Sequence, residues 1–294
     1  MIVGSPSFSA QALVTYDVMS PVKNAGIASV LSDRLRFTED VDSLRASWEN
    51  AKPFKHIVLD DFFDFGLLER VCREIPRIDD ETWVRESDER IKQFNHRSPV
   101  SLGQGASELI TLLHSAAFLY FLSEMTGVWE LLPDPYLQGA SYHVVPRGGF
   151  FHVHVDRNVA YSTGLVRRLA LMLYLNKGWK PEYGGQFELW NETGTERVTS
   201  VEPVFNRCLI FEVTDTSYHG LPNPVACPPG QARNSFAVYY HTVGKSGGAE
   251  IKAHSSVYAP TSVRRKGFNV KDLAKDLTPP LLLRTARKLL SRSE

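Results

Sequence analysis

The stretch GGFFHVHVD, residues 148–156, determines how the rest of the chain is interpreted. Its alternating apolar residues are typical of a β-strand, in which successive side chains point to opposite faces. His154 and Asp156 therefore share one face, and Val155 lies on the other. An imidazole nitrogen and a carboxylate oxygen placed in this way can bind one metal ion. Because the chain has nine histidines, the motif alone is better explained by a surface or hydrogen-bonded pair, so the downstream sequence has to decide.

A third metal ligand is expected from a second strand, and His219 is the candidate. It lies in TDTSYHGLPNP, residues 214–224, beside a glycine and a turn-forming Pro-Asn-Pro. Two histidines and one carboxylate with open positions suit Fe(II). Under strict alternation His152 shares the face of His154, so a site of three histidines is an alternative. The two-residue spacing to Asp156 favours His154.

Arg233 is the candidate for binding a second small molecule. It opens the run RNSFAVYYH, residues 233–241, which predicts a strand. A guanidinium offers a planar pair of donors that matches a carboxylate, as a dicarboxylate cosubstrate would require. An arginine at the start of a strand is also an ordinary surface cation. The order of H-x-D, a distal histidine and then Arg-x-Ser is a much narrower pattern.

The composition is that of a soluble chain with a substantial core. The 294 residues are 43% hydrophobic and 11% aromatic, and Lys+Arg equals Asp+Glu at 33 each. No net charge attracts nucleic acid or a membrane, and we expect no nucleic-acid partner. Three cysteines without C-x-x-C spacing predict reduced thiols. With neither a leader pattern nor an apolar run of membrane-spanning length, a cytoplasmic protein is expected.

The periodicities predict helices first and strands later. Residues 1–50 form an irregular lead-in with at most one helix, and residues 54–63 a short strand and turn. Helices are predicted over residues 67–75 and 106–125, the second closed by Gly127, with a loop at residues 77–104 between them. After residue 135, short apolar runs alternate with turn residues. The predicted strands are 141–145, 150–156, 168–175, 186–190, 197–201, 208–213, a short piece around His219, and 235–242.

This order predicts a mainly β module with supporting α-helices, a sandwich, jelly roll or barrel whose helices cover one outer face. We place the module at residues 51–245, with helical support over 51–135 and the β-rich part over 136–245. Residues 246–294 form a C-terminal extension that includes TPPLLLRTARKLLSR, residues 278–292. This basic amphipathic helix either packs on the protein itself or makes a peripheral membrane or partner contact.

Five blocks carry a resemblance to a known family, over approximately residues 52–245. The chain resembles the Fe(II)- and 2-oxoglutarate-dependent dioxygenases, in particular the prolyl 4-hydroxylase-like branch. The blocks are PFKHIVLDDFF (53–63), GGFFHVHVD (148–156), RRLALMLYLNKGWKPEYGGQFELW (167–190), EPVFNRCLIFEVTDTSYHG (202–220) and RNSFAVYYHT (233–242). The resemblance implies a double-stranded β-helix, or jelly-roll, fold related to the cupins.

The resemblance implies a role for each candidate residue. His154, Asp156 and His219 would hold the iron, and Arg233 would pair with the distal carboxylate of 2-oxoglutarate. Ser235, on the same strand face as Arg233, would add a hydrogen bond, and Tyr174 would reach the same carboxylate. Relatives also place a polar residue on the strand before H-x-D, for which Tyr142 and His143 are both candidates. Val145 stands near a position where relatives carry a tyrosine, so that contact is in doubt.

The implied activity is hydroxylation of an unactivated C–H bond, with O2 as oxidant, release of succinate and CO2, and possible use of ascorbate as a reductant. Desaturation or another oxidation is an alternative, as is a non-catalytic metal- or sugar-binding protein. The substrate is left open between a prolyl residue of a peptide, a free amino acid or other small molecule, and a cell-envelope sugar.

Overall fold

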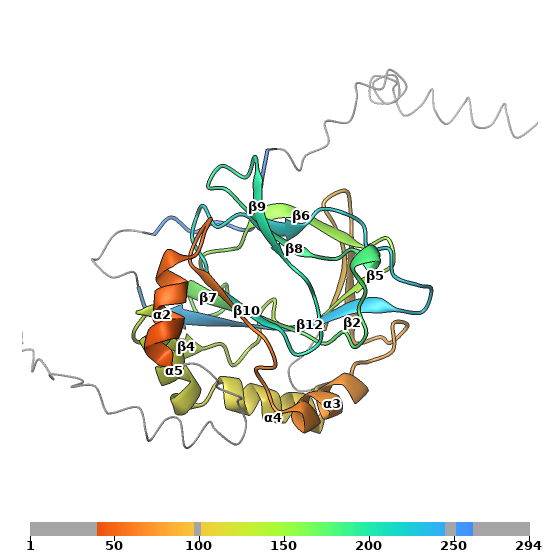
Figure 1. Ribbon diagram of the computed structural model, residues 1–294, viewed down its shortest axis with the longest axis horizontal. Helices are drawn as coiled ribbons and strands as arrows, with labels where there is room; N and C mark the ends of the chain where they lie inside the picture. The colour runs from red at the N-terminus through yellow and green to blue at the C-terminus, as the bar shows by residue number, and fades with distance from the viewer. Residues whose placement is uncertain (1–39, 97–100, 245–250, 261–294) are drawn as a thin grey trace, which may run out of the picture.

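A computed structural model of the protein describes residues 40–96, 101–244 and 251–260. Its strands form one antiparallel sheet that curls into a nearly closed barrel (Figure 1). The helices are α2 (Val41–Asn50), α3 (Phe65–Arg73), α4 (Gln104–Leu113) and α5 (Ala116–Thr126), with a short 3-10 turn at Pro181–Tyr183. The strands are β1 (His56–Leu59), β2 (Trp83–Ser87), β3 (Ile91–His96), β4 (Leu132–Pro133), β5 (Ser141–Pro146), β6 (Phe150–Val155), β7 (Val166–Tyr174), β8 (Phe187–Trp190), β9 (Arg197–Val201), β10 (Cys208–Glu212), β11 (His219–Leu221), β12 (Ala232–Thr242) and β13 (Val257–Tyr258).

The sheet has two halves that face one another across the barrel. One half is β1-β10-β7-β12-β5, the other is β6-β11-β8-β9, and β3 pairs with both β5 and β6 and so joins them. β13 pairs with β6, and Tyr258 of β13 lies opposite His154. The jelly-roll-type fold expected from the sequence is thereby confirmed. The limits of 51–245 for a separate module stay a prediction.

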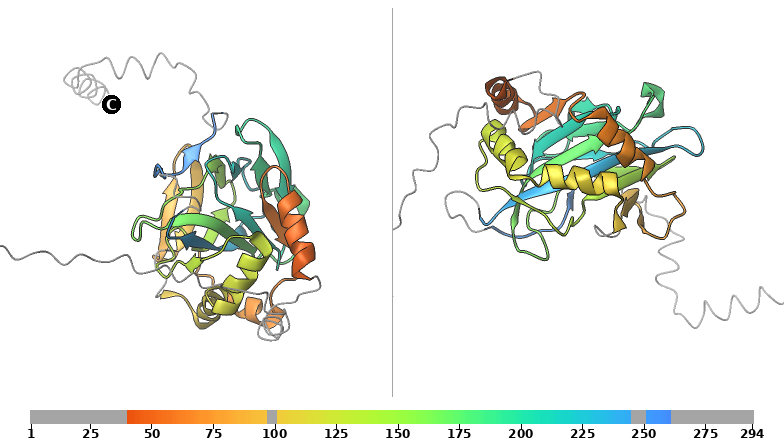
Figure 2. Two further views of the ribbon diagram at one scale, coloured as in Figure 1. Left: turned by 90° about the vertical axis from the view of Figure 1, so that its left-hand side faces the viewer. Right: turned by 90° about the horizontal axis from the view of Figure 1, so that it is seen from below.

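The helices cover the outer face of the first half, as Figures 1 and 2 show. Alternation along β7 and β12 sends one set of side chains toward the helices and the other into the barrel. Tyr240 of β12 donates its hydroxyl to the Leu113 carbonyl of α4 (3.2 Å), and Tyr142 of β5 donates to the Val71 carbonyl of α3 (2.9 Å). Each buried phenol thus ties the sheet to a helix, and the main hydrophobic core lies in this layer.

Two predictions about the helical half were wrong. The apolar stretch 106–125 is not one helix, because Ser115 accepts a hydrogen bond from the Phe118 amide and begins α5 at an angle of 50° to α4. Gly127 does end α5, at φ 71°. The predicted loop 77–104 contains the β2–β3 hairpin. The predicted C-terminal amphipathic helix lies outside the described residues.

Within the described ranges, no single helix is long and apolar enough to cross a membrane. Only α4 and α5 together, bent at their junction, reach the required length and composition.

Asn206 fastens the chain before α3 to the sheet. It is buried, adopts φ 61°, and pairs its side chain with both backbone groups of Phe63: the Phe63 amide donates to Oδ1 (3.0 Å), and Nδ2 donates to the Phe63 carbonyl (2.9 Å). Its own amide donates to the carbonyl of Tyr174, the last residue of β7. One asparagine therefore links the stretch 62–63 to the central strands.

Asn206→Ala should lower the free energy of unfolding by about 2–4 kcal/mol, because two buried backbone groups lose their partners. Equilibrium denaturation measured by circular dichroism checks this. Asn50→Ala, at the exposed end of α2, is the matched control and should change stability by less than about 0.5 kcal/mol. Equal losses in the two variants would contradict this role of Asn206.

Candidate active site

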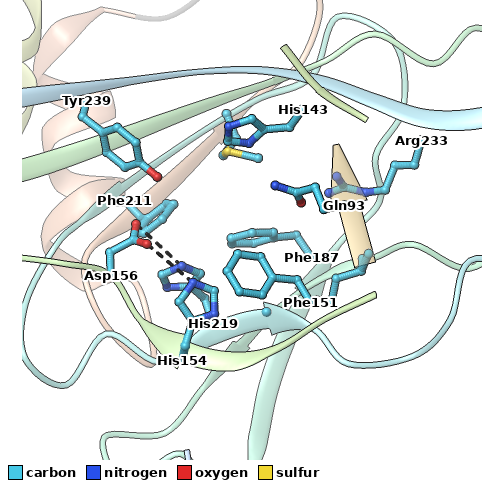
Figure 3. Close-up of a pocket in the computed structure, with 13 residues that line it drawn as sticks. Gln93, His143, Phe151, His154, Asp156, Phe187, Phe211, His219, Arg233 and Tyr239 are labelled. Carbon is cyan, nitrogen blue, oxygen red and sulfur yellow. Dashed lines mark ion pairs between the residues drawn. The ribbon is translucent and has the colours of Figure 1, made fainter. Parts of the chain in front are cut away.

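The predicted metal ligands come together at one end of the barrel (Figure 3). His154 near the end of β6 lies opposite His219 at the start of β11, and Asp156 follows directly after β6. Asp156 Oδ1 lies 3.5 Å from His154 Nε2, and its Oδ2 lies 3.8 Å from His219 Nε2. One ligand atom from each residue lies within 4.8 Å of the other two. Among the described residues this is the one cluster of three such groups that could hold a metal ion.

Each imidazole is held in the orientation that a metal ligand requires. His154 Nδ1 lies 2.8 Å from the His152 carbonyl, and His219 Nδ1 lies 2.8 Å from the Ser217 carbonyl. A carbonyl only accepts hydrogen bonds, so Nδ1 carries the proton and Nε2 keeps its lone pair. In both residues Nε2 is the atom directed at Asp156.

The charges of the cluster also suit a cation. Burial, together with the neighbouring His154, lowers the pKa of His219 to about 4, so its ring is neutral near pH 7. Burial opposes ionisation of Asp156, but His219 and His154 beside it lower the pKa of its carboxyl. A neutral imidazole and a carboxylate are the protonation states that bind a metal.

Aromatic rings hold the two imidazoles from the sides. Phe151 stacks on His154 with ring centres 3.9 Å apart, and Phe187 stacks on His219 at 5.2 Å. Phe211 adds a tilted contact with His219 at 4.8 Å. These rings line the cavity beside the ligands and exclude water from their flanks (Figure 3).

Arg233 lies at the other end of the same cavity. It is 3% exposed, and its Nε donates to the Gly185 carbonyl at 2.7 Å. Its Nη2 and the buried hydroxyls of Tyr174 and Ser235 make no hydrogen bond within the described chain. The three residues are neighbours, because Ser235 pairs with Tyr174 across β12 and β7, and the guanidinium lies 5.0 Å from the Tyr174 ring centre. Buried donors without acceptors are rare, and a carboxylate would satisfy all of them.

Gly185 makes room for this arginine. It adopts φ 80°, and a Cβ there would lie 3.1 Å from Arg233 Cδ and 3.4 Å from the Trp179 ring. Trp179 in turn donates its indole N–H to the Gly184 carbonyl at 2.9 Å. The Gly-Gly turn is therefore part of the arginine pocket.

The structure distinguishes between the two candidates on β5. His143 faces the cavity, and its Nε2 lies 3.1 Å from the Gly139 carbonyl. Burial lowers the pKa of His143 to about 4, so it is neutral. Tyr142 points to the opposite face and packs against the helices. Val145 is fully buried in a separate small apolar cluster, so it contributes no polar contact.

Strict alternation predicted that His152 faces the cavity beside His154, but it does not. His219 pairs with His154, but Leu221 pairs with Phe151, so β6 advances three residues while β11 advances two. This irregularity brings Phe151 into the cavity, and His152 packs beside Phe150 with ring centres 5.0 Å apart. A site of three histidines at this strand is thus not formed.

Several residues of the cavity were not identified from the sequence. Tyr239 points its hydroxyl toward Asp156, and Gln93 lies between the metal ligands and Arg233 (Figure 3). Tyr239 follows Arg233 and Ser235 at intervals that keep it on their face of β12, so alternation could have identified it. Gln93 belongs to the hairpin that was predicted as a loop.

Comparison with known proteins gives consistent results. Residues 137–241 match the model of the 2OG-Fe(II) oxygenase superfamily. No protein of curated function matches the chain significantly. A prolyl-4-hydroxylase of Pseudomonas putida is 18% identical with a TM-score of 0.51, covering 70% of this chain and 100% of its own. A prolyl hydroxylase of Trichoplax adhaerens, solved with a hypoxia inducible factor peptide fragment, is 15% identical with a TM-score of 0.50, covering 68% and 88%.

At these identities the structural likeness establishes the fold, and the family match covers the residues that build the site from His143 to Arg233. Residues 137–241 thus match the 2OG-Fe(II) oxygenase superfamily, and the chain has the fold of the prolyl 4-hydroxylases.

Proposed function

We propose that the protein is an Fe(II)- and 2-oxoglutarate-dependent dioxygenase that hydroxylates an unactivated C–H bond and releases succinate and CO2. One observation carries this proposal. A two-histidine, one-carboxylate cluster and a buried arginine with unsatisfied donors open into the same small cavity. A protein that only binds a metal or a sugar does not need a buried arginine with unsatisfied donors.

His154, Asp156 and His219 would hold the iron from one side. Two neutral imidazoles and one carboxylate are the ligand set that suits Fe(II) and leaves positions for other ligands. Arg233, with Tyr174 and Ser235, would bind the distal carboxylate of 2-oxoglutarate. When bound, the iron and the 2-oxo acid supply the activation of O2 and the oxidising power.

The residues of this chain orient the groups that would bind here and shield them from solvent. The carbonyls of His152 and Ser217 fix the imidazoles, and the three phenylalanine rings keep water from the ligands. His143 is neutral, and because its Nε2–H donates to the Gly139 carbonyl, its Nδ1 can only accept a hydrogen bond. A dry and rigid cavity favours reaction at the substrate over side reactions with solvent. A need for ascorbate stays a prediction.

Asp156→Ala and His219→Ala should each abolish iron-dependent release of succinate from 2-oxoglutarate, because each removes one of three ligands. Succinate is measured by mass spectrometry with and without Fe(II), and with and without ascorbate, and iron binding by anaerobic titration. His152→Ala is the matched control, a histidine on the same strand outside the cluster, and it should keep iron binding. Full iron binding and turnover in Asp156→Ala would refute the assigned ligand set.

Arg233→Gln should weaken 2-oxoglutarate binding by about 30-fold or more, because a buried charge-assisted pair is lost. Iron binding should be unchanged, since Arg233 is no ligand. Isothermal titration calorimetry of the metal-loaded protein with 2-oxoglutarate measures the first effect, and anaerobic titration with Fe(II) measures the second. Arg197→Gln, a surface arginine paired with Glu188, is the control and should bind 2-oxoglutarate normally. If Arg233→Gln binds 2-oxoglutarate as tightly as the parent protein does, another residue binds the distal carboxylate.

A further inference from the structure

A second buried arginine, Arg167, lies opposite His241 near the end of β12, whereas Arg233 lies near the start of that strand. It is 6% exposed, one of its terminal nitrogens (Nη2) donates to the Gln138 carbonyl at 3.1 Å, and its Nε has no acceptor. Within the described part of the chain, no carboxylate lies in ion-pair distance of it. Buried arginines without an anionic partner are rare in folded proteins. Arg167 therefore has the same unsatisfied character as Arg233.

A register irregularity turns Arg167 into the barrel. Along β7 and β12, Tyr239 pairs with Ala170 and Tyr240 with Leu169, but His241 pairs with Arg167, so Arg168 is passed over. Without this bulge Arg168 would take the inward position. Bulges beside active sites commonly redirect a side chain in this way.

Only one aromatic ring separates this guanidinium from a metal ligand. The carbon Cζ of Arg167 lies 3.5 Å from the centre of the Tyr239 ring, and the Tyr239 hydroxyl points toward Asp156 (Figure 3). The stacking fixes the plane of the guanidinium. A molecule bound to Arg167 is therefore held close to the metal position.

Arg167 lines a second cavity of about 320 Å³ that continues from the first. The two cavities share Gln93, His143, Phe151, Asp156 and Tyr239, but the second does not include Arg233 or His219. Its walls combine polar side chains, Asn95, Gln138 and Ser256 among them, with the rings of Phe151, Tyr161 and Tyr239. A cavity of this size fits a small molecule.

The charges around the second cavity favour an anion. Arg157 joins Arg167 on its wall, whereas its carboxylates are Asp156 and Glu86. Asp156 is committed to the metal cluster, which leaves two cations against one acid. Arg157 stacks on Tyr161 with Cζ 3.2 Å from the ring centre, and Tyr161 is 75% exposed, so this wall reaches the surface. An anion can thus enter past one arginine toward the other.

We propose that the second cavity binds the substrate, a small polar molecule whose anionic group, a carboxylate or a phosphate, pairs with Arg167. This inference rests on the proposed dioxygenase function, which places the reacting C–H bond beside the iron. A neutral peptide backbone would give Arg167 no anionic partner in ion-pair distance. The arginine would hold the substrate by its charge and present its neighbouring carbons to the metal.

Trifluoroacetate tests the anion site, because it is a small carboxylate whose 19F signal broadens on binding. The full-length protein is loaded with Zn(II) and 2-oxoglutarate, so that Arg233 is already occupied, and titrated with trifluoroacetate. We expect saturable binding that acetate displaces and the uncharged acetamide does not. Inorganic phosphate, as a second competitor, distinguishes the two anions: stronger displacement than by acetate favours a phosphate. With Fe(II) under anaerobic conditions, the bound signal should relax faster because the site is near the metal.

Arg167→Gln should weaken trifluoroacetate binding by about tenfold or more, as loss of a buried charge pair predicts. Arg168→Gln is the matched control, the neighbouring arginine that the bulge passes over, and should bind as the parent does. Retained 2-oxoglutarate binding shows that Arg167→Gln is folded; if it is not, Arg167→Lys, which keeps the charge, should bind weakly but still favour acetate over acetamide.

Absence of saturable binding in the parent, equal displacement by acetamide, or unchanged binding in Arg167→Gln would overturn the proposal. The outcome is separable from that of the dioxygenase proposal. A parent protein that fails to bind 2-oxoglutarate would contradict the enzyme assignment, whereas the trifluoroacetate titration of the Zn(II)-loaded Arg233→Gln variant would still report on Arg167.

Discussion

The close pairing of β11 with β6 is the constraint on which the site depends. It sets His219 opposite His154 and so fixes two of the three ligands at the spacing of neighbouring strands. Gly220 makes this approach possible, because a Cβ at that position would lie 2.9 Å from Val153 Cα and 3.0 Å from the Phe151 carbonyl. Any larger residue would push β11 away and separate the imidazoles. The distal histidine and the glycine after it therefore act as one structural unit.

The arginine pocket likewise depends on the pairing of two strands, in the opposite half of the sheet. Arg233 and Ser235 share a face of β12, and Tyr174 is brought beside them by the pairing of β12 with β7. The turn at Gly185 supplies both the space for the arginine and the carbonyl that orients it. Because each half of the barrel carries one set, the curl of the sheet determines how far the metal cluster lies from the arginine. The site is thus a property of the closed barrel and forms only when both halves are in place.

Much of this arrangement follows from the two-residue period of a strand, and that part could be predicted. The pairing of His154 with Asp156, and of Arg233 with Ser235, needed only alternation. His219 was found from its place beside a glycine and a turn downstream, and the resemblance supplied Tyr174. The β2–β3 hairpin was missed because its inward residues are polar: Gln93 faces the cavity where a core strand would carry an apolar residue. The break between α4 and α5 was missed because apolar residues continue on both sides of Ser115, whose hydroxyl caps the start of α5.

The features that could not be predicted lie where the alternation of side chains between the two faces of a strand is interrupted. An irregularity in β6 places Phe151, and not His152, beside the candidate metal ligands. A bulge in β7 places Arg167, and not Arg168, beside Tyr239. A one-residue shift reverses which face a side chain occupies, so no periodic pattern contains this information. The regular parts of the strands carry the candidate metal cluster and the arginine pocket. The irregular parts line the cavity that we propose for the substrate, and a second arginine, Arg167, faces it there. Specificity in this fold is therefore expected to depend on changes of register, which a sequence shows only after the sheet has been assembled.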